Sequence, residues 1–273
     1  MPAHARPRRC ALLTLAVLAV ALPAIAQDAA VSYQMPPQVL ADMIDAPPTP
    51  AVSVSPDNEW LLLLEQPGYP SIAEVAEPEL RLAGLRINPR TNGPSRARPL
   101  SGLLFQRLKD DKQVRVTGLP DEPRITGVSW SSDGKRIAFV VTADDRLTLW
   151  TAALEDGKAR RVTPEGFALN GVYGRPYAWL HGDEAFVAMA IPTGRGPAPE
   201  KSYVPEGPVV QENLGKKAPA RTLQDLLQNP YDESLFDHHA TSQIVVVGLD
   251  GAVRKVGEPA VYRDATPSPD GSL

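Results

Sequence analysis

Cysteine is almost absent from this sequence of 273 residues, whose single cysteine is Cys10. A disulfide framework and thiol chemistry are therefore excluded from everything after that residue. The aromatic share is only 6%, and the 28 Lys and Arg residues do not outnumber the 32 Asp and Glu residues. Without an excess or a stripe of basic residues, the chain is not expected to bind nucleic acid.

A long hydrophobic run is also missing. The apolar run Ala11–Leu22 is shorter than the stretch that a membrane-spanning helix needs. Three arginines precede this run, and the small-x-small phrase Ala24-Ile25-Ala26 follows it. This order predicts a secretory signal peptide over residues 1–26, with the mature chain beginning at Gln27. An uncleaved anchor is the alternative, whereas a lipoprotein cysteine would follow the apolar run and Cys10 precedes it. We expect a periplasmic or secreted protein without a stable membrane anchor.

Proline, in contrast, is abundant, with 29 residues, about twice the average usage. Residues 27–50 are predicted to form an N-terminal arm that leads into the first strand. Within this arm, Pro36 and Pro37 suit the first turn of a short helix, and apolar residues follow at helical spacing. The prolines at 47, 48 and 50 are expected to end that helix.

A phrase of strand, Ser-Pro-Asp-Gly turn and strand recurs along the rest of the chain. Copies begin at Ser53 and Val128, a weaker copy begins at Tyr177, and a last copy begins at Thr266. Asp can cap such a turn through its side chain, and Gly accepts the positive φ that the turn requires. The 49 residues from Trp130 to Trp179 match the blade period of a β-propeller.

The best-defined repeat predicts four strands joined by short turns, which is the blade of a propeller. The predicted strands are Ile125–Trp130, Arg136–Val141, Leu147–Leu154 and Ala159–Val162. The fold class is therefore all-β, with an incomplete β-propeller of four-stranded blades over residues 51–273. The chain also stops within a copy of the blade phrase, and we expect it to be part of a longer product.

Two predicted insertions interrupt the repeat, one near residues 71–99 and the other near residues 192–237. The first contains a short acidic helix candidate. The second begins as a loop rich in proline and glycine and ends in Arg221–Leu227, where Thr222 could cap a helix. Long insertions of this kind are often functional.

The chemistry of a serine hydrolase is not found in the sequence. Gly127-Val128-Ser129-Trp130-Ser131 fails the Gly-x-Ser-x-Gly pattern, and we interpret Ser129 as a strand residue. We interpret His181 as a loop residue and the adjacent His238 and His239 as surface or packing residues. No zinc, P-loop or dinucleotide motif is present, so we predict no metal, no cofactor and no catalytic residue in this chain.

Arg195, in the loop Thr193-Gly194-Arg195-Gly196, is the one candidate binding residue. A planar guanidinium suits a carboxylate ligand. A solvated loop arginine is the alternative interpretation.

Several longer phrases resemble the glutamyl endopeptidase branch of the prolyl oligopeptidase family of serine peptidases. They are YQMPPQVLADMIDAPPTPAVSVSPD from Tyr33, LAGLRINPRTNGPSR from Leu82, IPTGRGPAPEKSYVPEGPVVQEN from Ile191, RTLQDLLQNPYDESLFDHHATSQIV from Arg221 and VGEPAVYRDATPSPDG from Val256. These phrases fall largely in the insertions rather than in the generic blade repeat. The resemblance implies an N-terminal propeller that filters access to a catalytic α/β-hydrolase domain.

In that family the catalytic domain carries a Ser-Asp-His triad, and none of its positions exists in this chain. The resemblance therefore implies the substrate-gating part of an exported peptidase that cleaves after Glu and meets its peptide substrate through the missing domain. In this scheme Arg195 is the candidate for the glutamate carboxylate. The alternative is a stand-alone periplasmic binding scaffold of the TolB type, which shares the Pro-Asp-Gly repeat.

Overall fold

A computed structural model describes residues 34–202, 207, 215 and 223–268. The predicted signal peptide, the helix cap at Thr222 and the end of the last blade phrase lie outside these residues. The chain divides into Met1–Asp45 and Ala46–Leu273, which we describe separately. The first unit contains helix α2 (Gln38–Asp45), which confirms the short helix predicted between the two groups of prolines.

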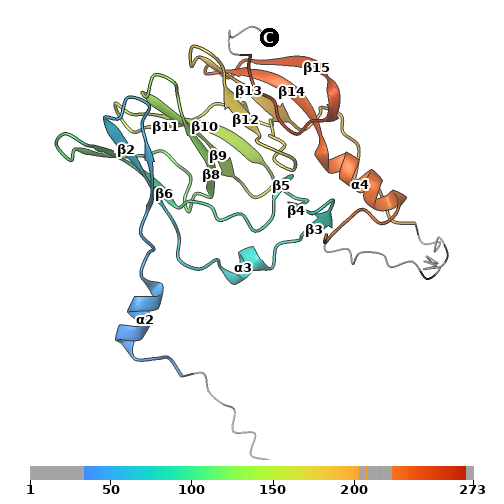
Figure 1. Ribbon diagram of the computed structural model, residues 1–273, viewed down its shortest axis with the longest axis horizontal. Helices are drawn as coiled ribbons and strands as arrows, with labels where there is room; N and C mark the ends of the chain where they lie inside the picture. Colours follow the sequence, from blue (N-terminus) through green and yellow to red (C-terminus); the bar gives the residue numbers. More distant parts are fainter. Residues whose placement is uncertain (1–33, 203–206, 208–214, 216–222, 269–273) are drawn as a thin grey trace, which may run out of the picture. The chain divides into compact units, whose positions relative to one another are not determined.

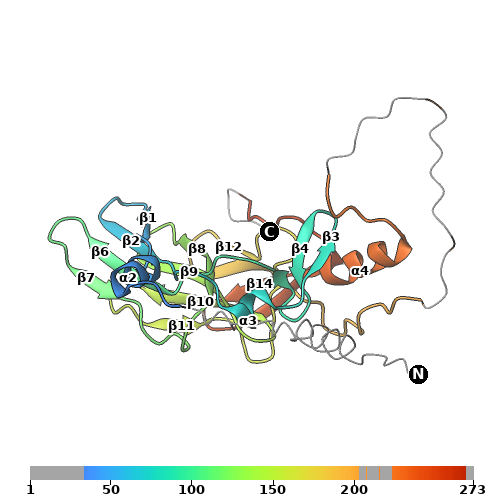
Figure 2. The same ribbon diagram turned by 90° about the horizontal axis from the view of Figure 1, so that it is seen from below.

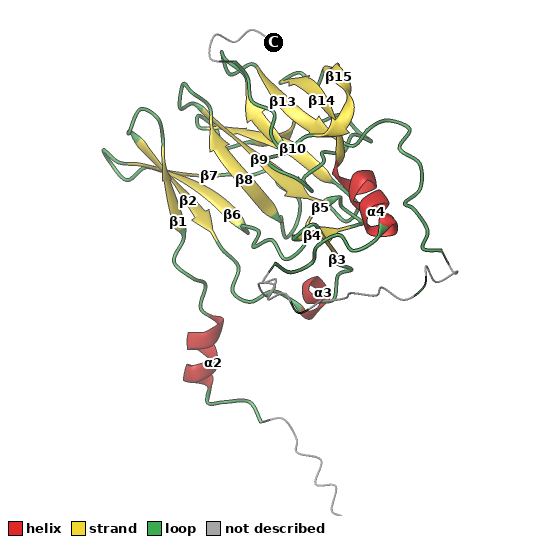
Figure 3. Cartoon of the chain, turned by 45° about the vertical axis from the view of Figure 1, so that its right-hand side comes forward, coloured by secondary structure: helices red, strands yellow, loops and turns green. Residues whose placement is uncertain are grey.

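The second unit contains three four-stranded antiparallel sheets, in each of which the strand order follows the chain (Figure 1). Blade 1 consists of β1 (Ala51–Val54), β2 (Trp60–Glu65), β6 (Gly102–Arg107) and β7 (Gln113–Arg115). Blade 2 consists of β8 (Ile125–Trp130), β9 (Arg136–Thr142), β10 (Leu147–Ala153) and β11 (Ala159–Arg161). Blade 3 consists of β12 (Tyr177–Trp179), β13 (Ala185–Ala190), β14 (Thr241–Gly248) and β15 (Val253–Val261). The incomplete propeller of four-stranded blades is confirmed, and Figure 3 shows the three sheets side by side.

The cores lie between successive blades because β9 alternates its side chains between the two faces of blade 2. The side chains on one face pack against blade 1, and those on the other face pack against blade 3. The first set is Ile137, Phe139 and Val141, and the second is Ala138 and Val140. On the blade 3 side they meet Phe186, which is fully buried. A two-residue period therefore lets one strand supply both cores.

Side-chain oxygens cap the turns of the blade phrase. The hydroxyl of Ser131 donates to Asp133 over 2.7 Å, and Asp133 accepts the backbone N–H of Lys135 over 3.0 Å. In blade 3 the residue at the end of the equivalent turn is Asp183, with φ of 56°. Its carboxylate instead accepts three hydrogen bonds from Ser132 and Asp133 of blade 2, so this turn joins two blades.

A β-bulge in β8 is stabilised from the neighbouring blade. The pairing of β8 with β9 shifts between Thr126 and Ser129, and Gly127 has φ of 60°. The Tyr177 hydroxyl of blade 3 lies 2.5 Å from the Gly127 oxygen and 2.7 Å from the Ala138 oxygen, and 2.9 Å from the Ser129 hydroxyl. Burial raises the pKa of Tyr177, so its hydroxyl keeps the proton that it donates.

Residues 71–99 form helix α3 (Ile72–Val75) and a separate sheet of β3 (Leu80–Leu82), β4 (Leu85–Asn88) and β5 (Gly93–Pro94). Ala83 and Gly84 both have positive φ, as a two-residue hairpin turn requires. The β3–β4 hairpin lies alongside helix α4 (Pro230–Ala240) in Figures 1 and 2. Leu82, Ile87 and Leu235 are buried together in the small core between them.

The prediction of a helix over Arg221–Leu227 is wrong for the described residues 223–227, which are not helical. Helix α4 begins only at Pro230. Asn229 caps that helix by accepting the N–H of Asp232, and a residue before proline is disfavoured in helical conformation. Asp225 has φ of 55°, and its backbone oxygen accepts from Gly84 over 3.0 Å. Contacts with the β3–β4 hairpin thus override the local helical pattern.

Candidate functional site

Four segments that are distant in the sequence meet at one polar cluster, and two of them contribute a buried asparagine. Asn92 immediately precedes β5, and Asn170 lies in the loop between β11 and β12. The end of α4 contributes His239, and the loop after β13 contributes Arg195. Asn92 and Asn170 are each only 1% exposed, so their amides must be satisfied within the protein. We call these four residues the asparagine node.

The amide nitrogens of the node hold α4 against the blades. Asn92 Nδ2 donates to Asn170 Oδ1 over 2.8 Å and to the His239 oxygen over 3.0 Å. Asn170 Nδ2 donates to the His239 oxygen and to the Thr241 oxygen, both over 2.9 Å. These bonds satisfy backbone carbonyls at the end of the helix, which lack partners within the helix.

The amide oxygen of Asn92 accepts hydrogen bonds from the guanidinium of Arg195 and the ring of His239. Arg195 Nη1 lies 2.9 Å and His239 Nδ1 lies 2.8 Å from this oxygen. Because the Asn92 nitrogen already donates twice, its oxygen faces His239, and Nδ1 must carry the proton. Burial, followed by the charges of His238 and Arg195, lowers the pKa of His239 to about 4. His239 is therefore neutral near pH 7.

Arg195 is half-buried and forms no ion pair with a carboxylate of the described residues. Its Nη1 also donates to the His238 oxygen over 3.3 Å. Burial lowers the pKa of Arg195, which still remains protonated at neutral pH. Burial and the charge of Arg195 also lower the pKa of His238. The guanidinium is thus a partly desolvated cation, and its Nε and Nη2 form no hydrogen bond with the residues that the structure describes.

A surface hollow of about 400 Å³ opens beside this guanidinium. Arg195, Asp237 and His238 are the ionisable residues among those that line it. The lining residues are Pro192, Thr193, Gly194, Arg195, Asp237, His238, Thr241 and Pro259. The volume is within the range of small-ligand sites, about 300–1,000 Å³.

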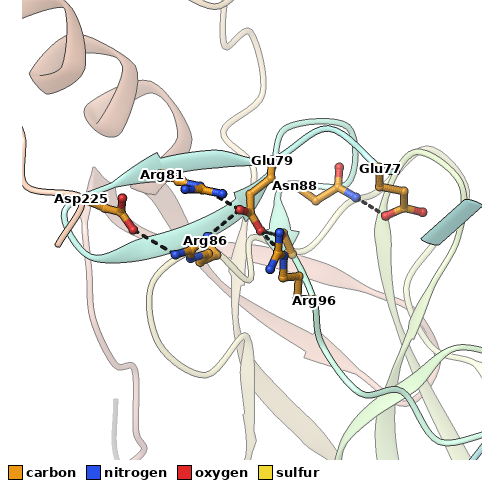
Figure 4. Close-up of polar contacts among 8 residues, drawn as sticks. Glu77, Glu79, Arg81, Arg86, Asn88, Arg96 and Asp225 are labelled. Carbon is orange, nitrogen blue, oxygen red and sulfur yellow. Dashed lines mark hydrogen bonds and ion pairs between the residues drawn. The ribbon is translucent and has the colours of Figure 1, made fainter. Parts of the chain in front are cut away.

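A second polar cluster, centred on Glu79, fixes the β3–β5 sheet (Figure 4). The carboxylate of Glu79 is 11% exposed and forms ion pairs with Arg81, Arg86 and Arg96 at 3.0, 2.7 and 2.9 Å. The Ser95 hydroxyl donates to the same carboxylate over 2.5 Å. This hydrogen bond and the arginines hold the pKa of Glu79 at about 2, well below its usual value.

Arg86 connects this cluster to the segment before α4. Its Nη2 lies 3.3 Å from the Asp225 carboxylate, and Figure 4 shows Arg86 between Asp225 and Glu79. Beside the cluster, Asn88 donates to Glu77 over 2.6 Å. The two insertions are therefore joined by ionic contacts as well as by the small apolar core.

The structure places the residues considered from the sequence as follows. Arg195 is in the asparagine node rather than in open solvent, while its role as a binding residue stays a prediction. Ser129 lies in β8, which confirms its interpretation as a strand residue, and its hydroxyl contacts that of Tyr177. His181 is exposed in the turn before β13, whereas His238 lines the hollow and His239 is buried.

Sequence reasoning missed Asn92 and Asn170. Asn92 has φ of 54°, a left-handed conformation that asparagine tolerates better than most residues. The dipeptide Asn92-Gly93 was a usable signal for a special turn. Asn170 gives no such signal, because its role depends on the distant end of α4.

Within residues 34–202 and 223–268, no group of three or more His, Cys, Asp or Glu side chains could hold a metal ion. None of the helices among these residues has the length and apolar character needed to cross a membrane.

Comparison with known proteins gives two related sequences. No family model matches the chain. The chain is 38% identical over 256 residues to a protein of Oryza sativa subsp. japonica described as a probable chloroplastic glutamyl endopeptidase, covering 89% of this chain and 27% of that protein. It is 39% identical over 249 residues to the protein of the same description from Arabidopsis thaliana, covering 87% of this chain and 26% of that protein. The chain thus spans about a quarter of the length of the curated relatives that it matches.

Solved structures with similar parts include an acylaminoacyl peptidase of Pyrococcus horikoshii, with a TM-score of 0.40, 12% identity and coverage of 80% of this chain and 26% of that chain. TolB of Acinetobacter baumannii gives a TM-score of 0.31 and 14% identity, covering 84% of this chain and 46% of that chain.

Proposed function

Since this chain is a homologue of glutamyl endopeptidases of the prolyl oligopeptidase family over about a quarter of their length, we propose that it is the substrate-gating propeller part of an exported serine peptidase. The observation that carries the proposal is this identity of 38–39%. The match covers 87–89% of this chain, so it extends over the two insertions that contribute Asn92 and Arg195 to the asparagine node, and not only over the blade repeat that many propellers share.

The proposed division of labour follows from chemistry. A serine becomes a good nucleophile when a histidine takes its proton and backbone N–H groups stabilise the oxyanion. The blades supply a wall that limits access, and the catalytic serine, aspartate and histidine belong to the remainder of the peptidase. We further propose cleavage after Glu, with Arg195 as a candidate ligand of the glutamate carboxylate.

Export is part of the same proposal. The basic start, the apolar run Ala11–Leu22 and the phrase Ala24-Ile25-Ala26 support a signal peptide. N-terminal sequencing of the protein from the periplasm is expected to begin at Gln27. A membrane-retained protein beginning at Met1 would contradict cleavage.

The decisive experiment uses the reading frame beyond Leu273. We expect a Gly-x-Ser-x-Gly motif followed by an Asp and a His. The longer product should react with a fluorophosphonate probe and cleave peptides with Glu before the scissile bond faster than matched peptides with Gln or Ala. The 273-residue chain alone should not be labelled.

The absence of a serine motif downstream would sink the peptidase proposal and leave a binding scaffold. Equal cleavage of the Glu, Gln and Ala peptides would sink only the specificity.

A further inference from the structure

Both asparagines of the asparagine node are followed by glycine. The dipeptides are Asn92-Gly93 and Asn170-Gly171, and no other asparagine of the sequence precedes a glycine. Asn92 has positive φ, whereas Asn170 and Gly171 do not, so the second dipeptide marks no turn of that kind. Asparagine is thermolabile, and a glycine after it leaves the next backbone nitrogen unhindered. The node therefore contains the two asparagines of the sequence that are most prone to deamidation.

The two glycines are required by close packing on one leucine. A Cβ on Gly93 would lie 2.9 Å from Cδ1 of Leu147, and a Cβ on Gly171 would lie 2.6 Å from the same atom. Leu147 is 3% exposed and belongs to the core between blades 2 and 3, so it has little room to move. The Gly171 N–H also donates to the Asn92 backbone oxygen over 3.0 Å. The reactive dipeptides thus follow from the packing of the fold.

Deamidation needs only the dipeptide and water. The backbone nitrogen of the glycine attacks the side-chain Cγ of the asparagine and gives its proton to water. Cγ becomes tetrahedral and then expels its nitrogen as ammonia, which leaves a succinimide ring. Water opens this ring at either carbonyl and gives aspartate or isoaspartate. The net change consumes water and releases ammonia.

In the folded chain, hydrogen bonds hold both of the nitrogens that would leave. Nδ2 of Asn92 donates to Asn170 and to the His239 oxygen, and Nδ2 of Asn170 donates to the oxygens of His239 and Thr241. Each asparagine is 1% exposed, so bulk water has almost no access. The two amides share the His239 oxygen at the end of α4. Separation of that end from the blades is therefore one local change that frees both.

We propose that Asn92 and Asn170 are deamidation sites, protected while the end of α4 is in place and modified when it separates from the blades. Neither aspartate nor isoaspartate carries a side-chain N–H, so a modified residue cannot donate to the His239 oxygen again. The lost donors leave buried carbonyl oxygens unsatisfied, which opposes the return of α4. Deamidation thus releases this end of the helix irreversibly. The inference does not rest on the proposed peptidase function.

Mass spectrometry of peptides measures the reaction directly, because a deamidated peptide is heavier by the difference between OH and NH2. The purified 273-residue chain is incubated at neutral pH with and without urea, and both dipeptides are followed over time. We expect each to react at least about tenfold more slowly in the folded chain than in urea, as for sites that react only after opening. Equal rates, or a faster reaction in the folded chain, would overturn the proposed protection.

A matched pair of cavities separates opening at α4 from unfolding of the blades. Leu235 packs α4 against the β3–β4 hairpin, whereas Leu103 is buried between blades 1 and 2. Leu235→Ala should accelerate both reactions in the folded chain by the same factor, about tenfold or more, and Leu103→Ala should accelerate them less. Equal acceleration by the two variants, or a response of one asparagine alone, would contradict release through α4. Valine at the same two positions gives the comparison with smaller cavities if an alanine variant does not fold.

Variants that carry the product test the release. In Asn92→Asp and Asn170→Asp, backbone amides of α4 should exchange with deuterium at least about tenfold faster than in the original chain, while exchange in blade 1 is unchanged. Asn58→Asp makes the same change at an exposed position and should leave α4 unaffected. Unchanged exchange in α4 of both node variants would show that deamidation does not release the helix.

Discussion

At the scale of single residues, Asp183 shows how one side chain in a turn can join two blades. The residue is 4% exposed, and its carboxylate accepts the N–H groups of Ser132 and Asp133 over 2.9 and 3.0 Å, and the Ser132 hydroxyl over 2.6 Å. Charged acceptors make stronger hydrogen bonds than neutral ones. Asn at the same position keeps the left-handed backbone but removes the charge and one acceptor oxygen.

We therefore expect Asp183→Asn to lower the free energy of unfolding by about 1–3 kcal/mol in urea denaturation. The matched control is Asp250→Asn, because Asp250 is exposed and accepts only the N–H of Ala252 in its own turn. The control should change stability by less than about 0.5 kcal/mol. A loss of equal size in both variants would contradict the role of Asp183 between blades.

His239 makes the stability of the fold depend on pH. Its pKa is about 4 in the folded chain, below the ordinary value of 6.5, because of burial and then of the charges of His238 and Arg195. The unfolded chain thus binds more protons than the folded chain between pH 6.5 and 4. Stability is full above pH 6.5 and is lost as the pH falls towards 4, by up to about 3 kcal/mol.

We expect His239→Gln to flatten this part of the curve of unfolding free energy against pH. His181→Gln, at an exposed turn position, should keep the slope of the original chain. The measurement is urea unfolding at several pH values between 7 and 4. Equal slopes in all three proteins would show that His239 does not control this window.

At the scale of secondary structure, the bulge in β8 depends on a hydroxyl from another blade. The Tyr177 hydroxyl reaches the oxygens of Gly127 and Ala138, and this side chain is 6% exposed. The hydroxyl carries one proton, which points to these buried carbonyl oxygens, so removing it takes away one buried hydrogen bond. We expect Tyr177→Phe to cost about 1–3 kcal/mol of stability, measured by thermal or urea unfolding.

Tyr262→Phe is the matched control for Tyr177→Phe. Its hydroxyl donates to the Glu258 oxygen over 2.8 Å at an exposed site, where water can replace it. We expect a change below about 0.5 kcal/mol. A Tyr177→Phe variant as stable as this control would mean that other groups or water satisfy the bulge.

The strands of blade 2 could be predicted from the sequence because their information is local. Alternating or continuous apolar runs between Asp-Gly turns give β8 to β11 within one residue at each boundary. The segment before α4 could not be predicted in the same way. Its helical pattern is overridden by Arg86 and Gly84, which contact Asp225 from a hairpin about 140 residues earlier.

At the scale of the whole second unit, the candidate site could also be predicted only in part from the sequence. Arg195 could be singled out because a loop arginine between two glycines is conspicuous. Its partner Asn92 is 103 residues away, and Asn170 carries no pattern of its own. Only the packing of α4 and the β3–β5 sheet against the blades brings these side chains together.

The blades form a linear series in which each core joins only two neighbours. Phe139 belongs to the core between blades 1 and 2, and Phe186 belongs to the core between blades 2 and 3. Both side chains are fully buried. Where stability is a sum of repeats and interfaces between neighbours, a weakened interface should affect the adjoining blades first.

We expect Phe139→Leu and Phe186→Leu each to lower the free energy of unfolding by about 1–2 kcal/mol, since each leaves a small cavity. The two variants should differ in where backbone amides exchange with deuterium. Phe139→Leu should accelerate exchange most in β2 and β6 of blade 1, and Phe186→Leu most in β13 and β14 of blade 3, read by mass spectrometry of peptides. Blade 2 contributes to both cores and should respond to both substitutions. Uniform acceleration across all three blades in either variant would show instead that the described blades unfold as one cooperative unit.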